Sequence, residues 1–545
     1  MSFFQLVRRE IRTSIPRLVC MSVVAGMSNA AILAAVNAGS QSPKNDHTPG
    51  FWASALFVIA LSLYIKTQYY INITGAVEIE AIIHRMRLRL MDGIRRSELA
   101  SIETIGRSRI ITTITQDTAL LKQASRVLIS GVQGLVLIFF VSIYIAYLSL
   151  PAFLLSAAVI GVAAIVLHRK NRQLKQWTSE ANSWTNQLFD RLSDLLDGFK
   201  EVRINKTRSD NLFEDSSEVS RTAANIKIWA DAEILKQMVT TQSLIYLLLG
   251  AVVFVVPLLS NSSESNATTQ TTMALLFIVG ACFGLVQSIP LLTAADAAAD
   301  RLDQLEADLR STEVSTEINA PANTAGFRTI NMQDVVFRYI DKSSEATFQV
   351  GPIQFILQAG ELTFIAGGNG SGKSTFLKLL AGLVAPNSGE ILLDGMLIDD
   401  NTRESYRALM SAIFTDYHLF KKLYGSMDAD PAEFDRLLEQ YQLFDKTRLI
   451  DNEFQNFDLS GGQRKRLALI VSLLEKRPIL LLDEWTSDQD PGFRRKFYDE
   501  LLPALKEAGK TVVVVTHDDR YINEFNLPAR RLRMDEGRFV EDAKA

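Results

Sequence analysis

The sequence has few of the residues that build disulfide frameworks and metal centres. Its 545 residues include 2 cysteines and 5 histidines. Both thiols, Cys20 and Cys282, lie in apolar runs, where we interpret them as small buried hydrophobic side chains. The cysteine count excludes a disulfide-stapled fold, and the spacing of Cys and His matches no zinc site. A strongly basic block is missing too, and with a formal net charge of −4 the charge pattern gives no support for nucleic-acid binding.

Long apolar runs are abundant in the first 300 residues. Hydrophobic residues make up 48% of the chain, and its mean hydropathy is slightly positive. The candidate membrane spans are residues 15–37, 51–72, 128–149, 151–168, 240–260 and 272–294. All except the fourth reach the roughly 20 residues that cross a bilayer as a helix. The sequence therefore predicts an α-helical transmembrane domain with six spans.

The basic residues are distributed unevenly among the connections between these spans. Those before the first span are Arg8, Arg9, Arg12 and Arg17, those after the second are Arg85, Arg87, Arg89, Arg95 and Arg96, and those after the fourth are Arg169, Lys170, Arg172 and Lys175. The three other connections are short and carry a single Lys. Because basic loops stay in the cytoplasm, we expect both termini and the two long connections to be cytoplasmic.

The two long connections, residues 73–127 and 169–239, are predicted to be helical. They contain no proline and few glycines, and their apolar residues recur at a spacing of three to four. Helices of this length leave the membrane and extend into the cytoplasm. We expect each connection to turn near its middle, at residues 101–107 and 198–206, and to contact a soluble domain there.

The composition changes after residue 300. A polar stretch with proline and glycine reads as a linker, and short β-branched strands then alternate with helical segments. We therefore divide the chain into a transmembrane domain at 1–305, a linker at 306–327 and an α/β domain at 328–545.

A phosphate-binding loop is the strongest motif of the α/β domain. Strand 361–366 runs into a G-x(4)-G-K-S segment and then a helix, and the residues we expect to bind nucleotide are Gly367, Gly368, Asn369, Gly370, Ser371, Gly372, Lys373, Ser374 and Thr375. Glycines let backbone N–H groups surround the phosphates. Lys373 is predicted to reach the β and γ phosphates of ATP and Ser374 to bind Mg²⁺.

Two further motifs accompany the loop. An apolar strand ends in Asp483 and Glu484, at the edge where ligands bind in open parallel sheets. We predict that Asp483 holds Mg²⁺ and that Glu484 polarises the attacking water. The segment Leu459, Ser460, Gly461, Gly462 and Gln463 precedes another helix, and it forms a second helix start of the kind that binds anions.

The order of these motifs resembles that of ABC-type ATPases, over about residues 325–545. The resemblance implies that residues 459–463 contact the ATP held by a second ATPase domain. It also implies that Tyr339 stacks on adenine, that His517 senses the γ-phosphate, and that Asp490 ends the loop linking the two sites. Thr415 stands where the family usually has a Gln that binds Mg²⁺, so Thr415 is our predicted ligand at that position.

Six spans ahead of one such domain resemble half of an ABC exporter of the plasma membrane. The segments 414–420 and 483–491 are similar to those of exporters of cyclic peptides, which include syringomycin-type lipopeptides, siderophore precursors and lasso-peptide microcins. This implies an ATP-driven peptide exporter that works by alternating access, with ATP and Mg²⁺ as cofactors and an identical chain as partner. A multidrug or lipid exporter, an importer subunit and a non-transport ATPase regulator remain open as alternatives.

Overall fold

The chain folds into two compact units. The computed structural model describes residues 3–10, 15–40, 47–255, 265–311, 326–338, 348–426, 428–525 and 527–540. The helical unit consists of Met1–Arg95 and Ile105–Ser311. The second unit, which we call the ATPase unit after the motifs predicted in it, consists of Arg96–Thr104 and Thr312–Ala545. The short segment at 96–104 thus belongs to the ATPase unit, although long helices precede and follow it in the sequence.

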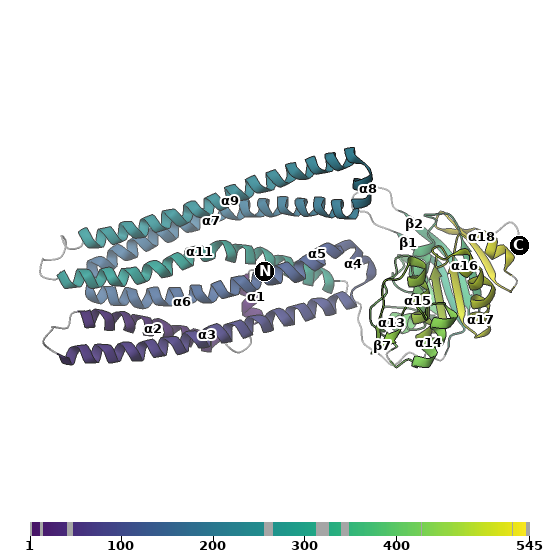
Figure 1. The fold of residues 1–545 in the computed structure, drawn as a ribbon, viewed down its shortest axis with the longest axis horizontal. Helices are drawn as coiled ribbons and strands as arrows, with labels where there is room; N and C mark the ends of the chain where they lie inside the picture. The colour runs from purple at the N-terminus through teal and green to yellow at the C-terminus, as the bar shows by residue number, and fades with distance from the viewer. Residues whose placement is uncertain are drawn as a thin grey trace. The chain divides into compact units, whose positions relative to one another are not determined.

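Six long helices dominate the helical unit (Figure 1). They are α2 (Ile15–Ser40), α3 (His47–Arg96), α6 (Thr118–Leu148), α7 (Leu150–Asp197), α9 (Lys206–Phe254) and α11 (Ser265–Arg310). The described residues of the six predicted spans fall on these helices, and residues 256–260 of the fifth span lie outside the described part of the chain. Five described helices are long and apolar enough to cross a membrane, and Leu150–Val162 is a shorter apolar stretch, in the place of the short fourth span. The helix α11 continues to Arg310, past residue 305 where we ended the domain, because Leu305 and Leu309 remain buried.

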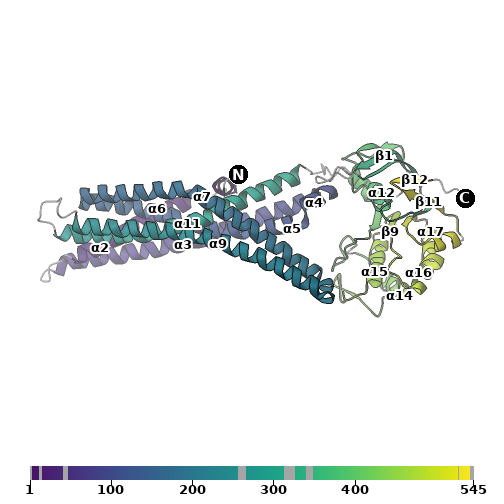
Figure 2. The same cartoon turned by 90° about the horizontal axis from the view of Figure 1, so that it is seen from above.

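The chain reverses where the sequence predicts turns. Between α3 and α6 lie α4 (Leu99–Ile105), α5 (Arg107–Thr112) and a π-helix, η1 (Thr113–Asp117), and the turn at Gly106 has a φ of 85°. The hairpin of α7 and α9 closes at α8 (Phe199–Ile204) (Figures 1 and 2). Ser149 caps α7 by accepting a hydrogen bond from the backbone N–H of Ala152, and Pro151 follows in the first turn.

Polar contacts in the helical unit join residues far apart in sequence. Arg301 of α11 makes two hydrogen bonds, of 2.6 and 3.0 Å, to the carboxylate of Asp117, whose side chain is 3% exposed. The short helix α1 (Phe3–Glu10) is attached at both ends. The backbone N–H of Phe3 donates to Asp296, and the buried carboxylate of Glu10 accepts from Arg89 at 2.6 Å.

The ATPase unit contains two main sheets. The six-stranded sheet has the order β12-β11-β3-β10-β9-β6 and consists of β3 (Leu362–Ala366), β6 (Met410–Ile413), β9 (Ile479–Asp483), β10 (Thr511–Val515), β11 (Arg530–Asp535) and β12 (Arg538–Val540). All neighbours in it are parallel except β11 and β12. The antiparallel sheet β2-β1-β4-β5 consists of β1 (Thr329–Arg338), β2 (Gln349–Gln358), β4 (Ser388–Leu393) and β5 (Met396–Leu397). A small pair, β7 (Leu449–Ile450) and β8 (Glu453–Phe454), lies apart from them.

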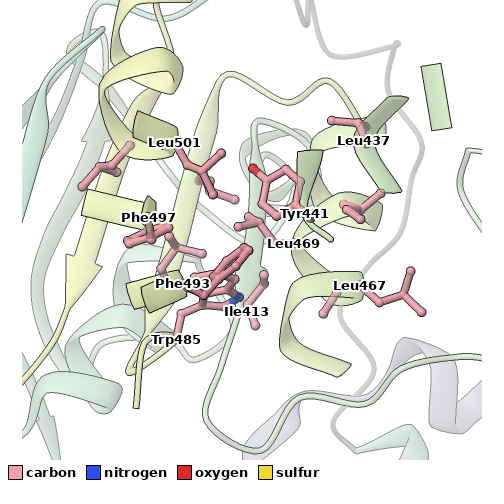
Figure 3. Close-up of a cluster of buried hydrophobic side chains, with 14 of the residues drawn as sticks. Ile413, Leu437, Tyr441, Leu467, Leu469, Trp485, Phe493, Phe497 and Leu501 are labelled. Atoms are coloured by element: carbon pink, nitrogen blue, oxygen red, sulfur yellow. The ribbon is translucent and has the colours of Figure 1, made fainter. Parts of the chain in front are cut away.

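Helices and an aromatic core hold the parallel sheet in place. The helices are α12 (Lys373–Leu380), α13 (Arg403–Arg407), α14 (Pro431–Gln440), α15 (Gly461–Leu474), α16 (Pro491–Lys496), η2 (Phe497–Leu501), α17 (Leu502–Glu507) and α18 (Asp519–Glu524). Strands β9 and β10 are buried along their whole length, as expected for parallel strands covered on both faces. Trp485 packs against Phe493 and Phe497 in the cluster drawn in Figure 3. The structure thus has the predicted combination of a domain of long apolar helices with an α/β domain.

Candidate functional site

Four adjacent parallel strands carry the predicted ATP-site residues at their carboxyl ends. In the order β3-β10-β9-β6, the strands lead into the phosphate-binding loop, His517, the pair Asp483–Glu484 and Thr415. Segments separated by about a hundred residues in the sequence therefore meet at one edge of the sheet. This is the edge at which ligands bind in open α/β sheets.

The phosphate-binding loop needs its glycines. The φ angles of Gly367, Gly370 and Gly372 are 156°, 77° and 100°, a region that L side chains rarely adopt. A Cβ on Gly367 would lie 2.2 Å from the carbonyl oxygen of Met534. The Nζ of Lys373 donates to the carbonyls of Gly367 and Gly368 at 3.0 and 2.8 Å. Burial lowers the pKa of Lys373, while the charges of Glu484 and Asp483 raise it.

The loop opens into a cavity of about 410 Å³. Its walls are Phe348, Gln349, Gly368, Asn369, Gly370, Ser371, Asp535 and Glu536. The half-exposed ring of Phe348 offers an apolar surface at the mouth of the loop. Sequence analysis missed this residue because a single Phe before a strand has no motif. Tyr339, the predicted adenine-stacking residue, lies outside the described residues.

Asp483 is a buried carboxylate with a free acceptor atom. It is 1% exposed, and its Oδ1 atom has no hydrogen-bond partner in the described part of the chain. Burial raises the pKa of Asp483, and the nearby hydroxyls of Ser374 and Thr415 lower it by smaller amounts. The structure therefore brings the three predicted Mg²⁺ ligands together around one carboxyl group.

Glu484 has an unusual backbone conformation. Its φ is +49°, the left-handed region that costs roughly 1–2 kcal/mol for a residue with a side chain. Its carboxylate Oε1 lies 2.8 Å from the Nε2 of His517. Strain of this kind gathers at functional sites, and here it directs the predicted base toward the predicted phosphate sensor.

The segment 459–463 begins helix α15 as predicted. Ser460 and Gln463 form a capping box, in which Ser460 Oγ accepts from the N–H of Gln463 and Gln463 Oε1 accepts from the N–H of Ser460 at 3.0 Å. The carbonyl of Gly462 accepts from Gln489 at 3.1 Å. Apart from hydrogen bonds to residues next to it in the chain, this segment therefore contacts the loop that follows Glu484, and no hydrogen bond of the described residues joins it to the phosphate-binding loop.

Asp490 has a structural place in that same loop. It caps α16 by accepting from the N–H of Phe493, and it pairs with Arg466 at 2.6 Å. These contacts fix the end of the loop, while a contact of Asp490 with nucleotide stays a prediction. Thr375 is buried in the first turn of α12, behind the loop.

Two acidic residues of the segment 96–104 contact the body of the ATPase unit. Glu103 pairs with Lys378 of α12 at 3.1 Å, and Glu98 pairs with Arg403 of α13 at 3.2 Å. Because Lys373 begins α12, one of these ion pairs acts on the helix that carries the phosphate-binding loop. Glu103 lies within the predicted contact point at 101–107. The second predicted contact point, 198–206, belongs to the helical unit, and its contact stays a prediction.

Known proteins resemble this chain over almost its whole length. A family model described as ABC transporter matches residues 350–487. ATP-binding protein SyrD of Pseudomonas syringae is 30% identical over 96% of this chain and 93% of its own length. An ATP-dependent lipid A-core flippase of Paraburkholderia xenovorans is 26% identical over 91% and 84% of the two chains. The solved structure of a bacterial Atm1-family ABC exporter with ATP bound has a TM-score of 0.75 and 19% identity, covering 98% and 95% of the two chains.

These similarities establish the fold and the family of the chain. The solved structure shows the fold, and the 30% identity over nearly the full length of both chains shows the family. The ATP-binding motifs, the strand-end site and the apolar helices agree with both. The chain therefore belongs to the ABC transporters, as a multi-pass half-exporter that binds ATP and couples its hydrolysis to transport.

Proposed function

We propose that this half-exporter carries a peptide-type substrate, namely a cyclic peptide, a lasso peptide or a siderophore precursor, out across the plasma membrane. The supporting observation is the 30% identity to SyrD over 96% of the chain. The segments 414–420 and 483–491, which resemble those of cyclic-peptide exporters, agree with it. Both termini and the ATPase unit lie in the cytoplasm in this proposal, because the basic connections do.

Glu484 is the general base for ATP hydrolysis in this proposal. The oxygen of water forms a bond to the γ-phosphorus, the bond from that phosphorus to the β–γ bridging oxygen breaks, and ADP leaves with the electron pair. Glu484 accepts the proton of the water, and His517, 2.8 Å away, orients that carboxylate beside the γ-phosphate. Lys373 exchanges its two carbonyl contacts for the β and γ phosphates. Catalysis then consists mainly of positioning and charge stabilisation.

The described residues fit a Mg²⁺ ion that is bound together with the nucleotide. Asp483 supplies a buried oxygen that lacks a partner, and the hydroxyls of Ser374 and Thr415 lie beside it. No group of three His, Cys, Asp or Glu side chains in the described residues could hold a metal. Oxygen ligands that are few in number, completed by phosphates, are typical of Mg²⁺. Bound Mg²⁺ supplies charge neutralisation of the phosphates.

Two copies of the chain form the working pump in this proposal. The segment 459–463 contacts the loop after Glu484 through the carbonyl of Gly462, and in this proposal its capping-box N-terminus binds the ATP of the partner. One chain carries a complete set of motifs, so two identical chains build two competent sites. ATP binding closes the ATPase domains, the cavity between the spans opens outward, and hydrolysis resets it.

A lipid or other hydrophobic cargo is the second candidate. A cavity of about 230 Å³ lies among α6, α7, α9 and α11. Of the described residues that line it, only Thr241 and Cys282 have side chains that are not hydrocarbon. Such a lining suits an alkyl group better than a peptide backbone, whose buried polar groups need partners. The lipid A-core flippase among the relatives fits this candidate.

Transport into inside-out vesicles separates the candidates. The full-length chain is reconstituted and supplied with ATP, and uptake of a labelled cyclic peptide is compared with translocation of a labelled lipid. We expect ATP-dependent uptake of the peptide, with no uptake by the Glu484→Gln variant. Lipid translocation without peptide uptake would replace the first candidate by the second. Steady ATP hydrolysis with neither cargo would favour a regulator.

A further inference from the structure

Lys465 is a buried charge next to the predicted base. It lies in the second turn of α15 and its side chain is 3% exposed. Its ammonium group has three N–H donors and three acceptors around it. These are the carbonyl of Glu484 at 2.9 Å, the hydroxyl of Ser487 at 2.9 Å and the carboxylate of Asp488 at 2.8 Å. Every donor therefore has a partner in the loop that follows strand β9.

Hydrogen bonds hold the backbone of Glu484 on both sides. Its N–H donates to the carbonyl of Val515, at the end of β10, at 2.9 Å. Its carbonyl accepts from Lys465, from the hydroxyl of Ser487 at 2.7 Å and from the backbone N–H of Ser487 at 3.2 Å. The φ of +49° lies between these two anchors. If the carbonyl were released, Glu484 could relax toward a negative φ, and its carboxylate would turn away from His517.

The main chain of Lys465 strengthens the same connection. Its carbonyl accepts from the indole N–H of Trp485 at 2.9 Å, and Trp485 is 1% exposed within the aromatic cluster of Figure 3. A Cβ on Gly462 would lie 2.5 Å from the carbonyl of Asp488, so the loop passes directly against the start of α15. The helix that begins with the segment 459–463 and the backbone of the base are thus one connected structure.

We propose that Lys465 is a positioning residue for ATP hydrolysis, which holds the carbonyl of Glu484 so that the strained backbone keeps the carboxylate against His517. An apolar side chain would fill a buried helix position without the desolvation cost of a charge, and an ion pair with a carboxylate that is 54% exposed contributes little net stability. The charge is therefore explained by geometry, because one ammonium group joins the carbonyl of Glu484 to the side chains of Ser487 and Asp488. This inference rests on the proposed role of Glu484 as the base.

The test is the steady-state kinetics of ATP hydrolysis by the full-length chain in vesicles. Lys465→Met keeps the length of the side chain and removes its donors. We expect kcat to fall at least fivefold while the KM for ATP stays within twofold of the native value. Lys476→Met is the matched control, since Lys476 pairs with Glu433 and is 69% exposed, and we expect it to leave both constants unchanged. A smaller loss of kcat, or a loss carried by KM, would overturn the inference.

A second variant separates positioning from folding. Ser487→Ala removes the other side-chain donor to the carbonyl of Glu484, at an exposed position that tolerates the change. We expect a two- to fivefold lower kcat, and a double variant no more than twofold slower than Lys465→Met. Unchanged kcat in Ser487→Ala, or effects that multiply in the double variant, would contradict a shared action on one carbonyl.

Glu484→Gln is measured in parallel. If it hydrolyses ATP normally, the proposed base is wrong, whereas an inactive Glu484→Gln beside a normal Lys465→Met rejects only the role of Lys465.

Discussion

The two units of this chain arrange their polar groups in opposite ways. In the ATPase unit, the predicted ATP-site residues come from short segments that each have their own pattern, and four neighbouring strands bring these segments to one edge. In the helical unit, single residues pair across 184 positions for Arg301 and Asp117 and across 79 for Arg89 and Glu10. A local pattern therefore reveals chemistry only where consecutive residues build the site. Four sets of substitutions test this difference between the units, ordered by the size of the expected effect.

Replacing the proposed base gives the largest expected effect. Glu484→Gln removes the proton acceptor but keeps the size and hydrogen-bonding reach of the side chain, so we expect kcat for ATP to fall by about 10²–10⁴-fold. Binding of a fluorescent ATP analogue is expected to stay within twofold. Glu500→Gln, at an exposed position of η2, is the control and is expected to keep full activity. Normal turnover by Glu484→Gln would show that a local motif misidentifies the chemistry even in the ATPase unit.

The buried ion pair of the helical unit gives the next largest effect. Arg301→Met leaves the 3% exposed carboxylate of Asp117 without its partner, and breaking such a pair costs several kcal/mol. Because Arg301 is 46% exposed, water compensates in part, and we expect a loss of roughly 2–3 kcal/mol in stability. Asp117→Asn removes the buried charge itself and is expected to lower the stability by less than Arg301→Met does.

Thermal unfolding of the detergent-solubilised chain measures both variants. Arg95→Met is the control, since Arg95 is 74% exposed in its pair with Asp92, and such surface pairs contribute at most about 1 kcal/mol. The order Arg301→Met, then Asp117→Asn, then Arg95→Met follows from whether a buried charge is left without its partner. An equal effect of the first and third variants would show that this long-range contact does not hold the helices together.

Sequence reasoning placed the elements of the ATPase unit because its strands and loops have local chemistry. The phosphate-binding loop, the acidic pair and the 459–463 segment each combine a strand or helix pattern with residues of fixed type. Because the strands that lead into the loop and the acidic pair lie in the parallel part of one sheet, these two groups of site residues meet at one edge of it. In the helical unit, hydropathy located the spans but not their partners. Asp117 lies in a π-helix, and nothing in its surroundings in the sequence points to Arg301.

Some residues of the ATPase unit were equally invisible to sequence reasoning. Lys465 and Phe348 belong to no motif, because only the folded chain brings Lys465 beside the backbone of Glu484 and Phe348 beside the phosphate-binding loop. The left-handed φ of Glu484 follows from anchors in β10 and α15, and a sequence pattern does not encode such anchors. The sequence therefore predicted which groups gather at the ends of the strands, but it did not predict how the fold holds them.

Replacing Asp483, the carboxylate at the end of β9, is expected to have a smaller effect and to raise the stability of the chain instead of lowering it. The folded chain raises the pKa of Asp483 by burial, so the folded state keeps the proton to higher pH than the unfolded state. Ionising Asp483 therefore lowers the stability of the folded chain. This cost is absent below the ordinary pKa of about 4 and grows as the pH rises toward the raised pKa. Asp483→Asn removes this cost, and we expect the nucleotide-free chain to melt about 2–4 °C higher at pH 8, with a smaller gain at pH 5.

Unfolding measured at several pH values, with and without Mg²⁺ and ATP, checks this expectation. Adding both is expected to stabilise the native chain and not the variant, so the advantage of the variant disappears. Asp499→Asn, at an exposed position, should show no pH-dependent gain. A variant that is less stable than the native chain at every pH would mean that Asp483 holds the sheet edge together instead of being held there for nucleotide.

The smallest expected effect concerns the segment 96–104, where the two ways of arranging polar groups meet. Glu98 and Glu103 pair with Arg403 and Lys378, contacts that are long-range in sequence but belong to the ATPase unit. Each pair is worth roughly 0.2–1 kcal/mol, so the double change of Glu98 and Glu103 to Gln leaves the chain folded and its basal rate of ATP hydrolysis within twofold of the native rate.

Transport per ATP, measured in vesicles from cargo uptake and phosphate release, is expected to fall by about two- to tenfold, because α12 carries both Lys378 and the phosphate-binding loop. Glu80→Gln, which removes an exposed ion pair of the helical unit with Lys122, leaves that ratio unchanged if the effect belongs to the segment, and an equal fall in both variants would assign it to general surface charge.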